Sequence, residues 1–143
     1  MATKKYLVPV DFSRCSIAAL RYAKRFAGRR AGSSLLVLHV ITESAAGVPF
    51  FLRRKFYQEL EQAAREKVES LTKRSNVKLL KPLVVIVRSF DPAKAITNQA
   101  RKSRVSMVIM GSHGRTGLKR LFLGSVAERT LRYARCPVLI VKS

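Results

Sequence analysis

Acidic residues, cysteines and long apolar runs are scarce in this chain of 143 residues. Because no apolar run is long enough to cross a bilayer, the sequence predicts no transmembrane segment. The first predicted strand starts near Tyr6, which leaves no room for a signal or transit peptide before it. Two cysteines, Cys15 and Cys136, stand in different predicted elements and lack the spacing of a metal site or a redox pair. These scarcities predict a reduced, cytoplasmic protein.

The shortage of acids leaves a large excess of positive charge. Lysine and arginine total 29 against 8 acidic residues, a formal net charge of +21. Between Arg101 and Arg135, nine basic residues accompany a single acid, Glu128. Such a surface attracts polyanions over a Debye length of about 8 Å at physiological salt. Two interpretations stay open: a solvated surface that aids solubility, or a face that contacts nucleic acid or an acidic membrane surface.

Length and patterning predict one domain over residues 1–143 with a sizeable core. Apolar runs typical of strands alternate with segments of helical periodicity. Strands are predicted at 6–10, 35–41, 83–87, 105–110 and 137–141, and helices at 13–31, 53–74, 92–103 and 125–134. Ser13 and Asp91 suit helix N-caps, and Gly32 suits the end of the first helix. The alternation predicts an α/β fold with a parallel sheet and right-handed crossovers.

A glycine motif lies between the fourth predicted strand and the helix that follows it. Gly111-Ser112-His113-Gly114 follows the apolar run 108–110, and Gly124-Ser125 comes after nine intervening residues. Glycines at such a junction let the backbone approach a ligand and turn several N–H groups toward one point. A helix N-terminus adds about half a positive charge, so the expected guest is a phosphate group. A plain surface loop is the alternative.

With its flanking residues, this motif closely resembles that of the universal stress protein family. Residues 110–117 and 124–129 match, as do 8–13 near the start and 136–141 at the end, so the resemblance extends over the whole chain. In the ATP-binding members, a glycine, two residues, a glycine, nine residues, then glycine with serine or threonine hold the nucleotide. The resemblance implies a five-stranded parallel open sheet in the order 3-2-1-4-5 with helices on both faces. That fold is Rossmann-like and resembles the adenine nucleotide alpha hydrolases.

The resemblance also implies a site for ATP or another adenine nucleotide, with Mg²⁺, where the winding of the sheet reverses. The implied nucleotide-binding positions are Pro9, Asp11, Val40, Met110, Gly111, His113, Gly114, Arg115, Gly124, Ser125 and Val126. Asp11 is implied to help hold the Mg²⁺ together with phosphate oxygens. The backbone of Val40 would meet the adenine, while its side chain belongs to the core. Asp11 and Ser125 have an alternative role as helix caps.

Other polar residues near the motif have simpler expected roles. Arg115, Lys119 and Arg120 either pair with phosphate oxygens or are solvated loop charges. His39 falls inside a strand and is expected in the core. His113 is doubtful as a catalyst, because the sequence offers no evident acid or nucleophile to orient it. No Walker A lysine, kinase signature, histidine cluster or Ser-His-Asp order is present either.

Three functional hypotheses remain open. The first is an ATP-binding regulatory homodimer of the stress-response kind, the second a basic nucleic-acid-associated module, and the third a slow ATP hydrolase. The aromatic residues do not interleave with the basic ones as a stacking platform would, which weighs against the second. In the resembled family the last strand commonly pairs with its symmetry mate. The predicted dimer interface is therefore Val138, Leu139, Ile140 and Val141.

Overall fold

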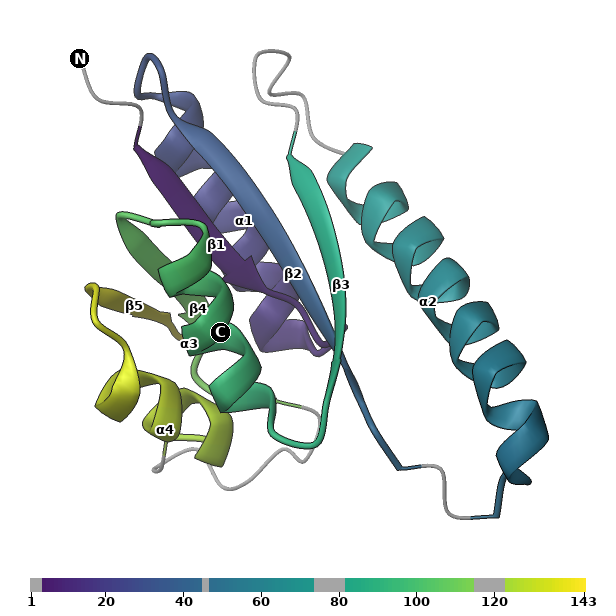
Figure 1. The fold of residues 1–143 in the computed structure, drawn as a ribbon. Coiled ribbons are helices and arrows are strands. Elements are labelled where there is room, and N and C mark those ends of the chain that lie inside the picture. Colours follow the sequence, from purple (N-terminus) through teal and green to yellow (C-terminus); the bar gives the residue numbers. More distant parts are fainter. Residues whose placement is uncertain (1–3, 45–46, 74–81, 115–122) are drawn as a thin grey trace.

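Five parallel strands form the central sheet of the protein in a computed structural model that describes residues 4–44, 47–73, 82–114 and 123–143. The strands are β1 (Lys5–Pro9), β2 (Ser34–Thr42), β3 (Leu83–Ser89), β4 (Met107–Gly111) and β5 (Val138–Val141). They follow the order β3-β2-β1-β4-β5, and every neighbouring pair is parallel (Figure 1). The expected topology is therefore confirmed.

Helices cover both faces of the sheet (Figure 1). They are α1 (Arg14–Gly28), α2 (Phe50–Lys73), α3 (Pro92–Lys102) and α4 (Ser125–Tyr133). In the part of the chain that the structure describes, no helix combines the length and apolar character needed to span a bilayer. Successive residues of a strand face opposite sides of the sheet, so each face has its own core.

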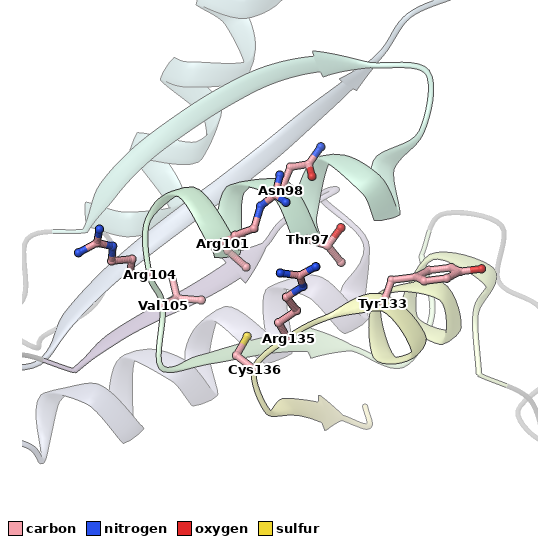
Figure 2. Close-up of a pocket in the computed structure, with 9 residues that line it drawn as sticks. Thr97, Asn98, Arg101, Arg104, Val105, Tyr133, Arg135 and Cys136 are labelled. Atoms are coloured by element: carbon pink, nitrogen blue, oxygen red, sulfur yellow. The ribbon is translucent and has the colours of Figure 1, made fainter.

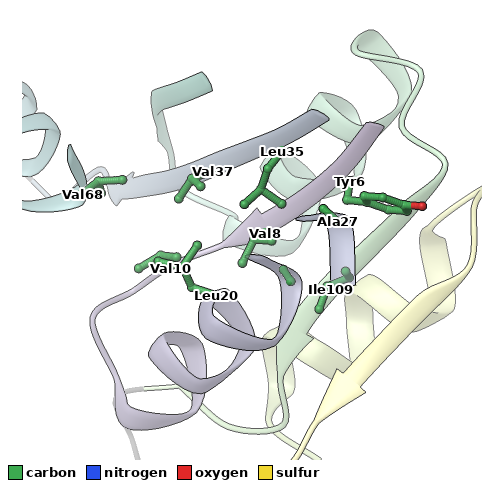
Figure 3. Packing of buried hydrophobic residues seen from close by; sticks show 10 residues of the cluster. Tyr6, Val8, Val10, Leu20, Ala27, Leu35, Val37, Val68 and Ile109 are labelled. Atoms are coloured by element: carbon green, nitrogen blue, oxygen red, sulfur yellow. The ribbon is translucent and has the colours of Figure 1, made fainter. Parts of the chain in front are cut away.

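The two cores use alternate residues of the same strands. On one face, Tyr6 and Val8 of β1 pack with Leu20 of α1 and Val68 of α2 (Figure 3). On the other face, Leu7 of β1 and its neighbours in β2 pack against α3 and α4. The second set includes Leu36, Leu38, Ile96, Ala100, Val108, Met110 and Ala127. The sheet is thus buried on both sides, as its nearly continuous apolar strands require.

Three element boundaries differ from the sequence prediction. Helix α1 ends at Gly28 rather than at 31, and Gly32 supplies a positive φ of 73° in the turn before β2. Helix α2 begins three residues early, because the Leu52 N–H already bonds to the Pro49 carbonyl and closes a first turn. The N–H of Val105 bonds back to Ala100 at the end of α3, so β4 starts only at Met107.

Polar side chains join the helices at three points. Ser13 caps α1 by accepting from the Ser16 N–H, and Asp91 caps α3 by accepting from the Lys94 N–H, as predicted. Buried Lys24 of α1 donates to the carbonyls of residues 71 and 72 in the last turn of α2, at 3.2 and 2.7 Å. Desolvation there lowers the pKa of Lys24. Asp91 also pairs with Arg129, which ties α3 to α4.

The Asp91–Arg129 pair predicts an acid-sensitive contribution to stability. The hydrogen bond from Arg129, followed by that from the Lys94 N–H, lowers the pKa of Asp91 in the folded protein. The contribution is therefore present above the ordinary aspartate pKa of about 3.9 and is lost as the pH falls through the folded value. We expect Asp91→Ala to lower Tm at neutral pH, with the difference from wild type shrinking in acid.

Asp91→Asn separates the two roles of this side chain, because asparagine still caps a helix but cannot form the ion pair. Its loss of Tm should be smaller than that of Asp91→Ala, as followed by circular dichroism over a pH series. A Tm deficit of constant size from neutral pH into acid would show that the charge of Asp91 contributes nothing.

Candidate functional site

The carboxyl ends of β1 and β4 lie side by side where the sheet reverses its winding. From β1 the sheet continues to β2 on one side and to β4 on the other. Asp11 follows β1, and Gly111 is the last residue of β4. Ligands of open α/β sheets bind in the crevice at such a point. The structure therefore brings the two predicted halves of the site, about 100 residues apart in sequence, to one edge.

The two halves of the glycine motif are in direct contact. The N–H of Gly124 donates to the Ser112 carbonyl at 2.8 Å. A Cβ built on Gly124 would lie 3.2 Å from that oxygen and 3.3 Å from the Cα of His113. Gly124 is also the N-cap residue of α4, with no side-chain hydrogen bond to the helix. The first turn of α4 therefore begins against residues 112–114, with N–H groups that have no intrahelical acceptor.

Asp11 lies against Gly114. A Cβ on Gly114 would come 2.8 Å from Asp11 Oδ2, so glycine leaves room for the carboxylate at this point. The other carboxylate oxygen, Oδ1, accepts from the Ser13 N–H at 3.0 Å. Ser13 rather than Asp11 is the N-cap of α1, and Gly124 rather than Ser125 is the N-cap of α4. The alternative capping roles of Asp11 and Ser125 were therefore wrong.

Gly111 is small for a reason that the motif did not predict. A Cβ at this position would lie 2.6 Å from the backbone carbonyl carbon of Cys15 and 2.8 Å from its oxygen. Backbone atoms cannot yield at such distances, so the end of β4 packs on the first turn of α1 only with glycine there. The sequence prediction of open space for a ligand at Gly111 was wrong, because α1 fills that space.

The two histidines differ in environment. His39 is buried, with Nδ1 2.6 Å from the Val10 carbonyl and its ring against Phe12, which confirms the expected core role. His113 Nδ1 lies 2.9 Å from Ser112 Oγ, and its buried Nε2 has no hydrogen-bond partner within the described residues. Phe12, next to Asp11, has a φ of 68°, a strained value that the sequence did not predict.

The remaining predicted positions contribute backbone rather than side chains to this edge. Met110 is buried in the core of the α3–α4 face, and Val40 and Val126 pack against the same cluster, as expected for Val40. Pro9 is the last residue of β1, and Ser125 is exposed at the first position of α4. Arg115, Lys119 and Arg120 lie outside the residues that the structure describes.

Sequence reasoning missed a second hollow, which lies between α3 and α4 away from the glycine motif. It has a volume of about 340 Å³, and Figure 2 shows Arg135 reaching between the two helices. Its polar lining consists of Thr97, Asn98, Arg101, Arg104, Tyr133, Arg135 and Cys136. Burial raises the pKa of the Cys136 thiol, so this cysteine is not an activated nucleophile. The basic run 101–135 was a signal for positive charge, but not for the hollow.

Comparison with known proteins shows close relatives over nearly the whole chain. The family model of universal stress proteins matches residues 2–142. Universal stress protein MJ0531 of Methanocaldococcus jannaschii is 33% identical over 144 residues, which cover 97% of this chain and 82% of that protein. Universal stress protein YxiE of Bacillus subtilis is 31% identical over 147 residues, which cover 96% of this chain and 98% of YxiE.

Solved structures agree with this assignment. The structure of MJ0577 from M. jannaschii has a TM-score of 0.87 and 34% identity, covering 100% of this chain and 98% of that one. Two structures at 19% identity share the fold: a universal stress protein in complex with cAMP, with a TM-score of 0.61, and one from Archaeoglobus fulgidus in complex with dAMP, with a TM-score of 0.62. They cover 99% of this chain and 98% and 100% of theirs. On the matched length, the identity and the shared sheet order, this chain belongs to the universal stress protein family.

Proposed function

We propose that this protein binds an adenine nucleotide, ATP in the first instance, at the carboxyl ends of β1 and β4. One observation carries the proposal: the Gly124 N–H donates to Ser112, which holds the start of α4 against residues 112–114, and Gly114 in turn lies against Asp11. A helix N-terminus and a glycine-rich backbone are thereby joined at the reversal of the sheet, an arrangement suited to phosphate. The cAMP and dAMP complexes of two proteins with this fold support the choice of base.

In this proposal each element has a separate task. Backbone N–H groups of residues 111–115 and of Ser125 and Val126 bind the phosphates, and the Ser125 hydroxyl donates to one of their oxygens. The adenine lies near the backbone of Val40. His113 Nε2, buried without a partner among the described residues, is a further donor or acceptor at this edge.

Asp11 suits a Mg²⁺ ion that arrives with the nucleotide. Magnesium in nucleotide sites commonly uses one or two carboxylates together with phosphate oxygens. Among the described residues no three acidic, histidine or cysteine side chains gather as a metal site. Asp11 alone would therefore hold the ion weakly, and we expect Mg²⁺ to bind with the triphosphate rather than before it.

Binding, with slow or no hydrolysis, is the activity that we propose. The Nδ1 of His113 bonds to the Ser112 hydroxyl, not to a carboxylate that would orient and activate it as a base. Phosphoryl transfer needs a positioned attacking group as well as neutralised charge. A nucleotide that is bound and held intact suits a regulatory protein of the stress response.

Calorimetric titration of nucleotide-stripped protein with Mg-ATP tests the site. We expect Gly114→Val to weaken binding about tenfold or more, because its side chain displaces the Asp11 carboxylate and narrows the phosphate site. Asp11→Asn should weaken Mg-ATP more than metal-free ATP. Asp91→Asn is the matched control, since it removes the same charge from the N-cap of α3 and should leave affinity unchanged. A folded wild type that fails to bind would contradict the proposal.

We also propose that two chains pair through β5. This strand lies at one edge of the sheet, and its four apolar residues, Val138–Val141, are only half buried in the single chain. An exposed apolar edge strand tends to be paired or covered. A two-fold dimer would pair each β5 with its partner.

Leu139→Lys tests this interface, because it places a charge in the middle of β5. We expect a monomer by sedimentation and an unchanged far-ultraviolet spectrum. The control is Leu83→Lys on β3, the opposite edge strand, where the side chain is 61% exposed. A dimer that survives Leu139→Lys but not Leu83→Lys would place the contact at the other edge.

The arginine-lined hollow favours a second candidate function, binding of nucleic acid phosphates. Arg101, Arg104 and Arg135 border the same cavity of about 340 Å³, and none forms an ion pair within the described residues. Guanidinium groups suit phosphate oxygens because they donate in a fixed fork. This binding would be independent of the adenine nucleotide.

Salt dependence distinguishes the two candidates. The affinity for labelled DNA or RNA should fall with salt, and Arg101→Gln/Arg104→Gln/Arg135→Gln should reduce the slope of log Kobs by about 1 per lost contact. Arg21→Gln/Arg25→Gln/Arg29→Gln removes equal charge from α1 as a control. Mg-ATP bound at the β1–β4 edge should survive salt that releases nucleic acid. Equal slopes for the two triple variants would show only general attraction to a basic protein.

A further inference from the structure

The first turns of α2 expose large apolar side chains to solvent. Phe50 and Phe51 are 86% and 80% exposed, and the next three apolar residues on this side, Leu52, Phe56 and Leu60, are 46%, 37% and 38% exposed. We name these five residues the apolar tip. In Figure 1 the start of α2 stands apart from the sheet and from the other helices. Contiguous exposed apolar surface of this kind marks an interaction site.

The apolar tip is not a frayed part of the core face. Leu52, Phe56 and Leu60 recur every four residues and form one stripe along the helix. The residues of α2 that are buried against the sheet, Tyr57, Ala64 and Val68, follow a different line. The helix therefore has two apolar stripes: one packs on the sheet, and the other, at the N-terminal end, has no partner among the described residues.

Basic residues flank the exposed stripe. Arg53, Arg54 and Lys55 follow the two exposed phenylalanines directly, and all three are exposed. The first acid of the helix is Glu59, which lies 3.9 Å from Lys55. Phenylalanine and leucine beside arginine and lysine at the end of a helix form the pattern of a segment that lies in a membrane interface.

We propose that the apolar tip docks this protein on an anionic lipid bilayer. The apolar side chains would enter the boundary between headgroups and acyl chains, and residues 53–55 would remain at the level of the anionic headgroups. A second copy of the chain fits this surface less well, because it would bring the same three cations and two chains of charge +21 together. An anionic bilayer supplies both the apolar phase and the opposite charge. This contact does not depend on the proposed nucleotide site.

Flotation with lipid vesicles tests the docking. The full-length wild-type chain should float with vesicles of phosphatidylcholine mixed with phosphatidylserine, and not with phosphatidylcholine alone. Phe50→Ser/Phe51→Ser should lose most of the bound fraction. Phe90→Ser is the matched control, since Phe90 is 79% exposed but lies between β3 and α3, and this variant should float as the wild type does.

Charge removal separates the tip from the general basicity of the chain. Each basic residue near an anionic surface contributes about fivefold to partitioning, so Arg53→Gln/Arg54→Gln/Lys55→Gln should reduce it about a hundredfold. Arg21→Gln/Arg25→Gln/Arg29→Gln on α1 carries the same loss of charge and should have a much smaller effect. Equal losses in the two triple variants would overturn the proposal in favour of diffuse attraction.

The absence of tryptophan from the chain permits a direct measurement of insertion. Phe51→Trp places a single emitter at the tip, and its fluorescence should shift to the blue on phosphatidylserine-containing vesicles and be quenched by lipids brominated on the acyl chains. A tryptophan that stays in a watery environment on bound vesicles would overturn insertion. Failure of the wild type to float, together with a change of oligomeric state in Phe50→Ser/Phe51→Ser, would assign the tip to a second copy instead.

Discussion

The contact between the end of β4 and the first turn of α1 is the constraint on which the candidate site depends. Gly111 meets the backbone of Cys15 so closely that a Cβ would lie 2.6 Å from the carbonyl carbon. Because β4 ends there, residues 112–114 turn away beside Asp11, and Gly114 can lie against that carboxylate. The hydrogen bond from Gly124 to Ser112 then determines where α4 starts. One missing side chain therefore aligns a carboxylate, a glycine-rich loop and a helix N-terminus.

Helix α2 has two halves with opposite surroundings. Its C-terminal half is held by Val68, which is fully buried, and by the Lys24 ammonium, which donates to two carbonyls of the last turn. Its N-terminal half begins with two phenylalanines at least 80% exposed. Hydrophobic burial and hydrogen bonding stabilise the first half within the protein, whereas the second half leaves apolar surface in water, where only a further partner would cover it.

Positive charge has different consequences on the different faces. On α3 and α4, arginines border a hollow whose neighbouring residues are mostly hydrogen-bond donors, a chemistry suited to phosphate. On α2, the cations stand beside phenylalanine and leucine, a combination suited to a lipid interface. The net charge of +21 attracts any polyanion, but the neighbours of each cation select the kind of partner.

The sequence by itself determined the alternation of strands and helices, the caps at Ser13 and Asp91, the core position of His39 and the family. These features depend on local patterns of two to four residues or on a motif that remains visible in one dimension. Only the tertiary structure decided that Gly111 is required by α1, that Arg101 and Arg135 share a hollow, and that Phe50 begins a helix and faces solvent. Exposure and close approach depend on what packs against a residue, and those neighbours come from parts of the chain that local patterns do not connect.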